Sequence, residues 1–154
     1  MLSKNRIHRI KCQGYSGYSD EEISALAFGN RVTFVLCSAV LFVGVVMSNI
    51  PILTSLLALS ILSLFLAYHP FDYIYNYILR GPLGRPKLPK RGAQLKFACA
   101  IAIVWIGSQI YFFYNQQMLA GYISGGSMFI VPLLVSTTDF CVPSNIYNAI
   151  FKVK

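Results

Sequence analysis

Acidic residues are scarce in this chain of 154 residues, which has five Asp and Glu against thirteen Lys and Arg. Charged residues of either sign make up 12% of the sequence, about half the share that is usual in soluble domains. Hydrophobic residues make up 56%. A small soluble domain keeps much of its surface in water, so it could not hide this amount of apolar surface. The composition therefore indicates an integral membrane protein.

The long apolar runs have no charged side chain at their centres. Ionisable residues at membrane depth usually mark proton relays and ion paths, so their absence argues against a coupled pump or an ion transporter. The sequence also lacks a phosphate loop, a dinucleotide fingerprint and a nucleophile elbow. Neither His8 nor His69 has a second ligand at the spacing of a metal site. We therefore expect no enzymatic activity, no cofactor and no metal.

The four cysteines stand singly, without a C-x-x-C pair or a secreted disulfide framework. Cys37 and Cys99 lie inside apolar runs and are expected to be small buried side chains. Cys141 and Cys12 are predicted on the same side of the membrane, and one interpretation is a thiol site. The other is an interfacial Cys141 beside Asp139, an acid that caps the following turn. A neighbouring carboxylate does not favour a thiolate, so the second interpretation is preferred.

Four apolar segments are long enough to cross a bilayer, and they form two pairs with short turns at residues 49–51 and 115–117. The first pair is close to the lower limit of about 17 residues for a transmembrane helix. The sequence predicts an all-α membrane protein with four transmembrane helices arranged as two hairpins. The predicted spans are about residues 32–48, 51–68, 97–114 and 118–138.

The basic residues lie in the N-terminal arm, at Arg31, in the loop between the hairpins and at the C-terminal tail, while both hairpin turns lack Lys and Arg. Cytoplasmic segments of membrane proteins carry an excess of Lys and Arg. This distribution predicts a multi-pass protein of the bacterial cytoplasmic (inner) membrane with both termini cytoplasmic. Because basic flanks also fit anionic lipid head groups, the net charge of +8 does not indicate nucleic-acid binding.

The same features divide the chain into four parts. They are a basic cytoplasmic arm (1–18), a first hairpin unit (19–80), a cytoplasmic loop rich in Pro, Gly and basic residues (81–95) and a second hairpin unit (96–154). Ser19 and Glu22 have the spacing of a capping box, so the first helix is predicted to begin near Asp20. The residues expected to contact lipid head groups or a partner protein are Arg80, Arg85, Lys87, Lys90, Arg91 and Lys96.

Each hairpin is followed by a segment with the pattern Ile-Tyr-Asn-x-Ile, then an apolar and a basic residue. These segments, at residues 71–80 and 144–152, are predicted to be short amphipathic helices in the membrane interface. Since each unit has an even number of spans, we interpret the two units as a parallel repeat; the alternative is convergence of two interfacial helices. The first helix is predicted to have an apolar face of Phe71, Ile74, Tyr75, Ile78 and Leu79, and a polar face of Asp72, Tyr73, Asn76 and Arg80.

The fourth predicted span contains Gly121 and Gly125 at G-x-x-x-G spacing, with Ser124 beside them. Small residues allow another helix to approach closely, so these three are predicted helix-packing residues. A partner helix within the same bundle is favoured, because a four-helix protein must first pack on itself. Gln109 is the most polar residue deep in a span and is expected to bond a neighbouring helix.

The order of these parts resembles that of a bacterial membrane family, domain of unknown function 4395. The likeness covers about residues 28–151 and lies in the first hairpin, the aromatic segment from Pro70, the loop at residues 85–89, and a second hairpin ending in Phe140 and Cys141 with Tyr147 soon after. Many members of that family carry a second cysteine where this chain has Ser144, which puts a dithiol role in doubt here. The resemblance implies a topology rather than an activity.

We therefore expect a non-enzymatic accessory or structural subunit of a membrane complex, in contact with membrane lipids and their anionic cytoplasmic head groups and with no nucleic acid. One alternative is a thiol-linked membrane redox or sulfur-handling protein that uses Cys141, with Cys12 as its second cysteine. A second alternative is a small-molecule or lipid permease built on the repeat, with Gln109 and Ser127 in an uncharged pore.

Overall fold

The structure is a computed structural model that describes residues 2–153, and this part of the chain is helical without strands. The prediction of an all-α protein is thereby confirmed. The helices are α1 (Lys4–Ile10), the π-helical turn η1 (Lys11–Tyr15), α2 (Asp20–Val46), α3 (Ile50–Phe65), α4 (Pro70–Ile74), the π-helical turn η2 (Tyr75–Leu79), α5 (Ala93–Tyr114), α6 (Met118–Thr138) and α7 (Val142–Phe151).

Three of these helices, α2, α5 and α6, are long and apolar enough to cross a membrane. Helix α3 is shorter than these three, with 16 residues. Together with α4 and η2, which are bent away from it by 82°, it forms a fourth apolar segment. The helices thus give a membrane protein with three candidate spans, or four if the bent pair counts as one.

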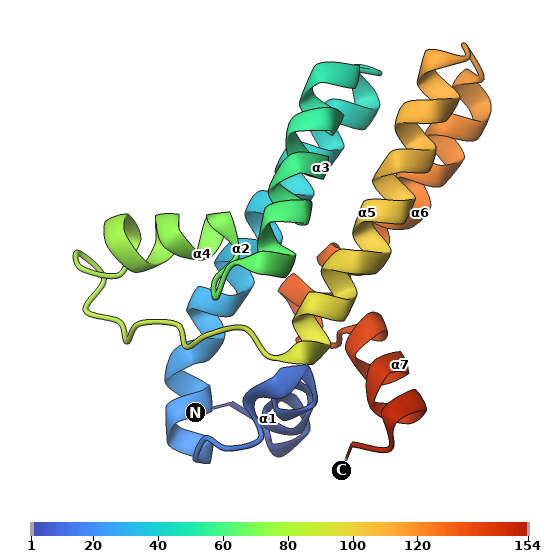
Figure 1. The fold of residues 1–154 in the computed structure, drawn as a ribbon. Helices are drawn as coiled ribbons and strands as arrows, with labels where there is room; N and C mark the ends of the chain where they lie inside the picture. Colours follow the sequence, from blue (N-terminus) through green and yellow to red (C-terminus); the bar gives the residue numbers. More distant parts are fainter. Residues whose placement is uncertain (1, 154) are drawn as a thin grey trace.

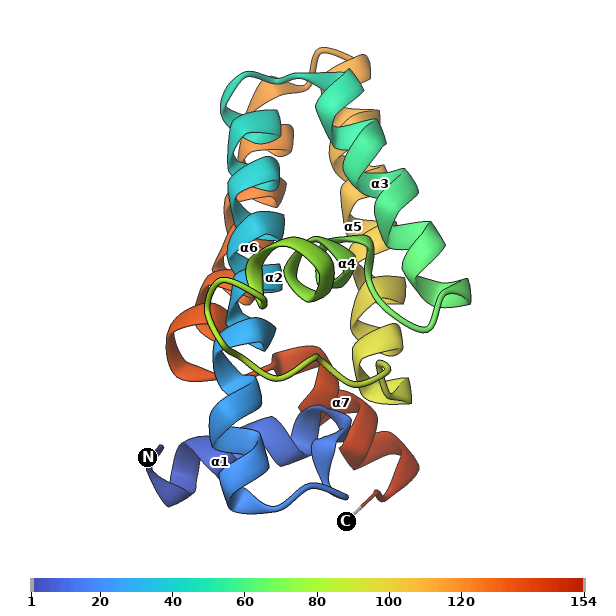
Figure 2. The same ribbon diagram turned by 90° about the vertical axis from the view of Figure 1, so that its left-hand side faces the viewer.

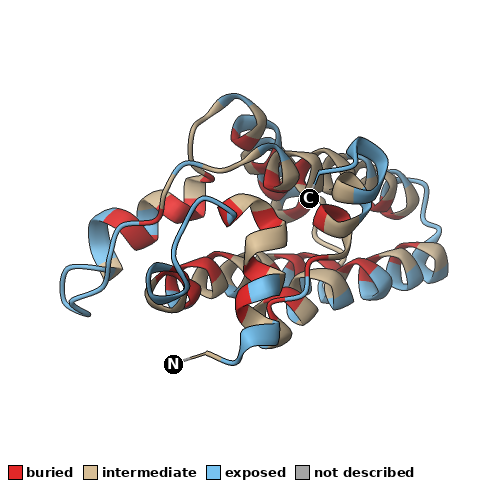
Figure 3. Ribbon diagram, turned by 90° about the horizontal axis from the view of Figure 1, so that it is seen from below, coloured by how far each residue is buried: buried red, intermediate tan, exposed pale blue. Residues whose placement is uncertain are grey.

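Figure 1 shows α2, α3, α5 and α6 as an upright bundle, with the α2–α3 and α5–α6 turns at the same end. The α4–η2 segment projects sideways from this bundle, and α1, η1 and α7 lie at the opposite end, near both termini (Figures 1 and 2). The most extensive helix contacts are those of α2 with α6 and of α3 with α5. Buried residues face the spaces between helices, while exposed residues lie on their outer sides (Figure 3).

Helices α2 and α3 begin at side-chain caps that can be found in the sequence. Ser19 Oγ accepts from the Glu22 N–H at 3.3 Å, and Glu22 Oε2 accepts from the Ser19 N–H at 2.8 Å. This capping box confirms the predicted start of α2 at Asp20. Asn49 Oδ1 caps α3 in a similar way, accepting from the Ile52 N–H at 3.0 Å. The end of α3 at Phe65 comes before the predicted limit of residue 68, because the backbone is extended at the next residue.

The N-terminal arm is folded, which the sequence interpretation did not anticipate. Ile7, Ile10 and Tyr15 are buried, and they pack with Ile23 of α2 and Leu95 of α5. Ile7 and Ile10 share one face of α1, since residues three apart are neighbours on a helix. The arm therefore closes over the end of the bundle where the chain termini lie.

The predicted faces of the helix after the first pair were wrong. The structure buries Phe71, Asp72, Tyr75 and Asn76, while Ile74 is 38% exposed and Ile78 64% exposed. The polar residues point inward because partners in the rest of the fold satisfy them. The apolar ones can point outward because lipid is as apolar as a protein core.

Candidate functional site

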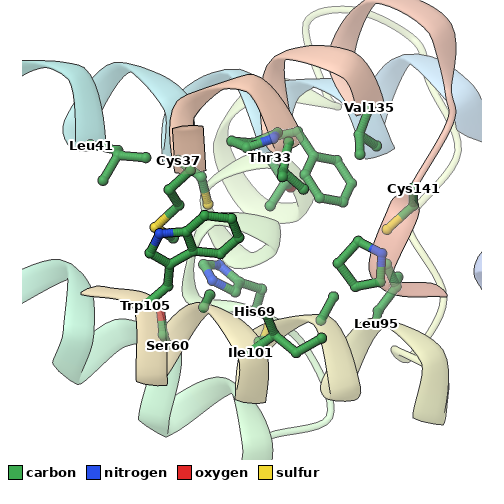
Figure 4. Close-up of a pocket in the computed structure, with 18 of the residues that line it drawn as sticks. Thr33, Cys37, Leu41, Ser60, His69, Leu95, Ile101, Trp105, Val135 and Cys141 are labelled. Carbon is green, nitrogen blue, oxygen red and sulfur yellow. The ribbon is translucent and has the colours of Figure 1, made fainter. Parts of the chain in front are cut away.

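A cavity of about 110 Å³ lies at the centre of the bundle, between α2, α3, α5 and α6 (Figure 4). Most of its wall is apolar, as in the cavities that hold small apolar ligands. Residues from every bundle helix contribute, so packing of the whole bundle creates the space. The apolar wall includes Phe34, Leu41, Leu56, Leu95, Trp105 and Val135, and the remaining wall includes Thr33, Ser60, His69, Arg91, Cys37, Cys99 and Cys141.

His69 holds one side of the cavity and is only 3% exposed. Its Nδ1 accepts from the Phe71 N–H at 3.2 Å, and the backbone N–H of His69 donates to Asp72 Oδ2 at 2.8 Å. These two bonds close the first turn of α4, whose proline at the first position lacks an N–H. The imidazole lies in the midst of the cavity-lining side chains (Figure 4).

A buried ion pair between Asp72 and Arg91 is linked to His69 by the hydrogen bond to Asp72. Arg91 Nε and Nη2 donate to the two carboxylate oxygens of Asp72 at 2.6 and 2.9 Å, and Thr33 Oγ1 donates to Asp72 Oδ1 at 2.6 Å. The side chains of Asp72 and Arg91 are 3% and 5% exposed. The pair joins α4, the long loop and α2 at one point. Such burial is tolerated because the charges are paired and the carboxylate is fully hydrogen-bonded.

Arg91 was predicted to contact lipid or a partner, and that prediction was wrong, because Asp72 holds its side chain inside the protein. Lys96 is half-buried and donates to Leu64 O at 3.0 Å, near the end of α3. The rest of the predicted basic group is exposed. Its members are Arg80, which donates to Asn76 O, Arg85 over the ring of Phe28, Lys87 over the rings of Tyr68 and Tyr77, and Lys90.

The two cysteines of the predicted thiol site lie in different surroundings. Cys141 is 1% exposed, lines the cavity and accepts a hydrogen bond from Ser144 Oγ at 3.1 Å. Burial raises the pKa of the Cys141 thiol, and the bond from Ser144 only partly opposes this. Cys12 is half-buried, with its Sγ 3.8 Å from His8 Nε2. All four cysteines are free thiols, and the raised pKa of Cys141 disfavours its thiolate form.

Asp139 is a second buried carboxylate, at the end of α6. Arg6 Nε donates to its Oδ2 at 2.6 Å, and Arg31 Nε and Nη2 donate to Oδ1 and Oδ2 at 2.7 and 2.6 Å. Gln13 Nε2 donates to its backbone oxygen at 2.8 Å. The prediction that Asp139 caps the following turn was wrong, because these partners from α1, η1 and α2 occupy it. The cluster fastens the N-terminal segment to the bundle.

The small residues of α6 lie at contacts inside the bundle. A Cβ added at Gly121 would lie 2.5 Å from the ring of Phe113 in α5, and one at Gly125 would lie 2.5 Å from Val45 in α2. Ser124 Oγ accepts from Trp105 Nε1 at 3.1 Å. Gln109 Nε2 contacts Met128 Sδ of α6 at 3.2 Å, which agrees with the expected bond to a neighbouring helix.

Sequence reasoning missed both carboxylate clusters and the place of His69 in the cavity. A usable signal was present, because Asp72 and Asp139 are the only acidic residues after Glu22. A carboxylate beside an apolar run needs a cationic partner or a set of hydrogen-bond donors. The sequence does not say which arginines these are, because Arg6 and Asp139 are 133 positions apart.

Comparison with known families completes this description. The model of the family described as Domain of unknown function (DUF4395) matches residues 27–152. The chain belongs to this family. The resemblance predicted from the sequence is thereby confirmed. A DUF4395 domain here comprises most of α2, all of α3 to α6, and α7, and it includes every residue that lines the cavity. A search of curated proteins and a search of solved structures gave no match.

Proposed function

We propose that this DUF4395 protein is a non-enzymatic membrane protein that binds a small, mainly apolar molecule in its central cavity. The observation that carries the proposal is the cavity itself, which has about 110 Å³ of space inside a wall of mostly apolar side chains. Apolar cavities of about 150 Å³ stay dry and take up benzene or xenon. A space of this size fits a molecule of a few heavy atoms rather than a lipid.

We further propose that the chain crosses a bacterial inner membrane four times, with both termini cytoplasmic. Both helix–helix turns, at residues 47–49 and 115–117, lie at one end of the bundle and contain no Lys or Arg (Figure 1). The basic residues gather toward the other end, as the positive-inside rule requires of the cytoplasmic side. The exposed Arg80, Arg85, Lys87 and Lys90 are placed to meet anionic head groups there.

A parallel repeat is part of this proposal. If the two units are equivalent, α2 corresponds to α5 and α3 corresponds to α6. The contact between α2 and α6 then corresponds to the contact between α5 and α3, and these two helix contacts are the most extensive. In both units the Asn of the shared pattern binds a segment outside its own helix. Asn76 Oδ1 accepts from the Leu88 N–H at 2.8 Å, and Asn148 Nδ2 donates to Cys12 O at 2.8 Å. The correspondence of the two helix contacts favours duplication over convergence, and the shared Asn makes a contact outside its helix in both units.

The environment of Cys141 favours ligand binding over the thiol alternative. A redox or sulfur-transfer role needs a thiolate. Burial raises the pKa of the Cys141 thiol, and Ser144 Oγ donates a hydrogen bond to its Sγ. The role of an accessory subunit in a larger complex stays a prediction, as does the permease alternative.

Xenon is a suitable probe, because it is inert toward thiols and quenches tryptophan fluorescence as a heavy atom. Trp105 is the only tryptophan of the chain, and it lines the cavity. For protein in lipid nanodiscs under xenon pressure, we expect quenching with a saturable part, above the linear part caused by xenon dissolved in lipid.

The matched variants are Ala102→Leu, which fills the cavity, and Ala100→Leu, which adds the same atoms to α5 away from it. The saturable part should disappear in the first variant and persist in the second. Ala98→Leu is a second cavity-filling variant if Ala102→Leu does not fold, because Ala98 also lines the cavity. Equal saturable quenching in native and filled proteins would overturn the proposal.

A further inference from the structure

Several polar groups of the cavity wall are already hydrogen-bonded within the protein. Thr33 Oγ1 donates to Asp72 at 2.6 Å, and Ser60 Oγ donates to Leu56 O at 2.9 Å. Arg91 gives its Nε and Nη2 donors to Asp72, which also neutralises its charge. These groups are therefore poorly placed to bind a ligand, and the paired charges give no preference for an ionic one.

His69 differs from these groups, because one of its ring nitrogens has no partner in the part of the chain that the structure describes. Its Nδ1 is an acceptor for the Phe71 N–H at 3.2 Å and so carries no proton. A neutral imidazole then has its hydrogen on Nε2. A second proton is disfavoured, because Nδ1 faces an N–H donor and Arg91 lines the same cavity. The Nε2–H has no hydrogen-bond partner within residues 2–153, and residue His69 as a whole is 3% exposed.

The position of this donor is fixed by the fold. The start of α4 holds His69 through the bonds to Phe71 and Asp72, and the rings of His69 and Phe71 lie 5.3 Å apart. A single water would be held weakly by one donor in an apolar wall, because buried waters usually make two to four hydrogen bonds. A donor without a partner in a mostly apolar cavity wall instead favours a ligand that supplies an acceptor.

From this geometry we infer that the cavity takes a small neutral molecule with an apolar body and one hydrogen-bond acceptor, such as a carbonyl or ether oxygen. His69 Nε2–H donates to that acceptor, and the apolar wall from α2, α5 and α6 surrounds the remainder. This inference rests on the proposed function and names its ligand class. A site with one preplaced donor discriminates against an analogue of the same shape that lacks the acceptor.

Two probes of matched shape test the inference, cyclopentanone and methylenecyclopentane, in which a CH₂ group replaces the oxygen. After correction for partition into lipid, we expect cyclopentanone to bind on the order of tenfold more tightly, the value of one hydrogen bond. The chain has two histidines, so ¹⁵N-histidine labelling resolves His69, with His8 of α1 as an internal control. Cyclopentanone should shift the His69 Nε2–H resonance, and methylenecyclopentane should not.

His69→Ser is the matched variant, because the Ser Oγ can replace Nδ1 as the cap of α4, while the Nε2–H is lost and the short side chain does not reach its place. In this variant the two probes should bind equally. Equal binding of both probes to the native protein would overturn the inference and leave the proposed function standing. An Nε2–H signal that cyclopentanone does not move would also overturn it. If neither probe binds, or if both bind Ala102→Leu as well as the native protein, the proposed function and the inference fail together.

Discussion

Asp72 and Asp139 are both buried and both held by arginine, but the two carboxylates lie in different parts of the molecule. Asp72 pairs with Arg91 alone, whose side chain is 5% exposed, and takes further hydrogen bonds from Thr33 and from the backbone of His69. Asp139 pairs with Arg6 and Arg31, whose side chains are 32% and 25% exposed. The first cluster is enclosed by the protein and lies at the cavity wall, whereas the arginines of the second cluster are partly exposed.

This difference leads us to expect that burial of the partner, rather than the number of partners, sets how much stability is lost when the carboxylate is removed. A charge left alone in a dry interior keeps its full desolvation cost, while a cation that reaches water can be rehydrated. We therefore expect the single arginine of Asp72 to make that cluster the more sensitive one.

Asp72→Asn should have the largest effect, because it leaves the Arg91 cation buried without a counter-charge. We expect the free energy of unfolding to fall by about 3–5 kcal/mol, measured by denaturation in mixed detergent micelles. The double variant Asp72→Leu with Arg91→Met removes both charges and should lose less than the single one. A single variant as stable as the native protein would show that Arg91 reaches water, and the contrast between the clusters would collapse.

Asp139→Asn should cost less, about 2 kcal/mol, because both of its arginines can take up water. Its main effect should be local, since Asp139 holds Arg6 of α1 at 2.6 Å. Hydrogen exchange of the backbone amides in α1 should accelerate while that of α5 stays unchanged.

Asp20→Asn is the control for this variant, because it breaks an exposed pair with Lys11 at 2.7 Å. It should leave exchange in α1 close to that of the native protein. If Asp139→Asn does the same, Asp139 does not fasten the N-terminal segment.

Thr33→Val should have the smallest effect, about 1.5 kcal/mol, because it keeps the shape of the side chain but removes a hydrogen bond to a carboxylate. The lost bond is the 2.6 Å contact of Oγ1 with Asp72. The measurement is the same detergent denaturation, with Thr137→Val as the control, since Thr137 is exposed and its hydroxyl bonds only to its own helix. Equal losses in both variants would mean that the Asp72 carboxylate does not need Thr33.

Part of the fold could be predicted because its causes are local. The capping pair Ser19 and Glu22 lies within one turn, so it located the start of α2 correctly. The faces of the helix after Pro70 could not be assigned in the same way. An apolar stripe such as Ile74 and Ile78 fits lipid as well as it fits a protein core, so periodicity does not distinguish outside from inside in a membrane protein.

The candidate site could not be predicted from the sequence, for a related reason. His69 looked like a lone histidine without a metal partner, and its place in the cavity depends on the 82° bend between α3 and α4. No pattern near His69 in the chain indicates Leu41 or Val135, which line the same cavity from other helices.

The sequence by itself determined the membrane class, the family, the helical composition and the positions of the short turns. Each of these follows from composition or from residues that are close in the chain, where apolar runs and capping side chains act directly. The tertiary structure alone decided which arginine meets which aspartate and that a cavity remains between the helices. Ion pairs and cavities depend on how helices that are far apart in the chain pack together, and local sequence patterns carry no information about that packing.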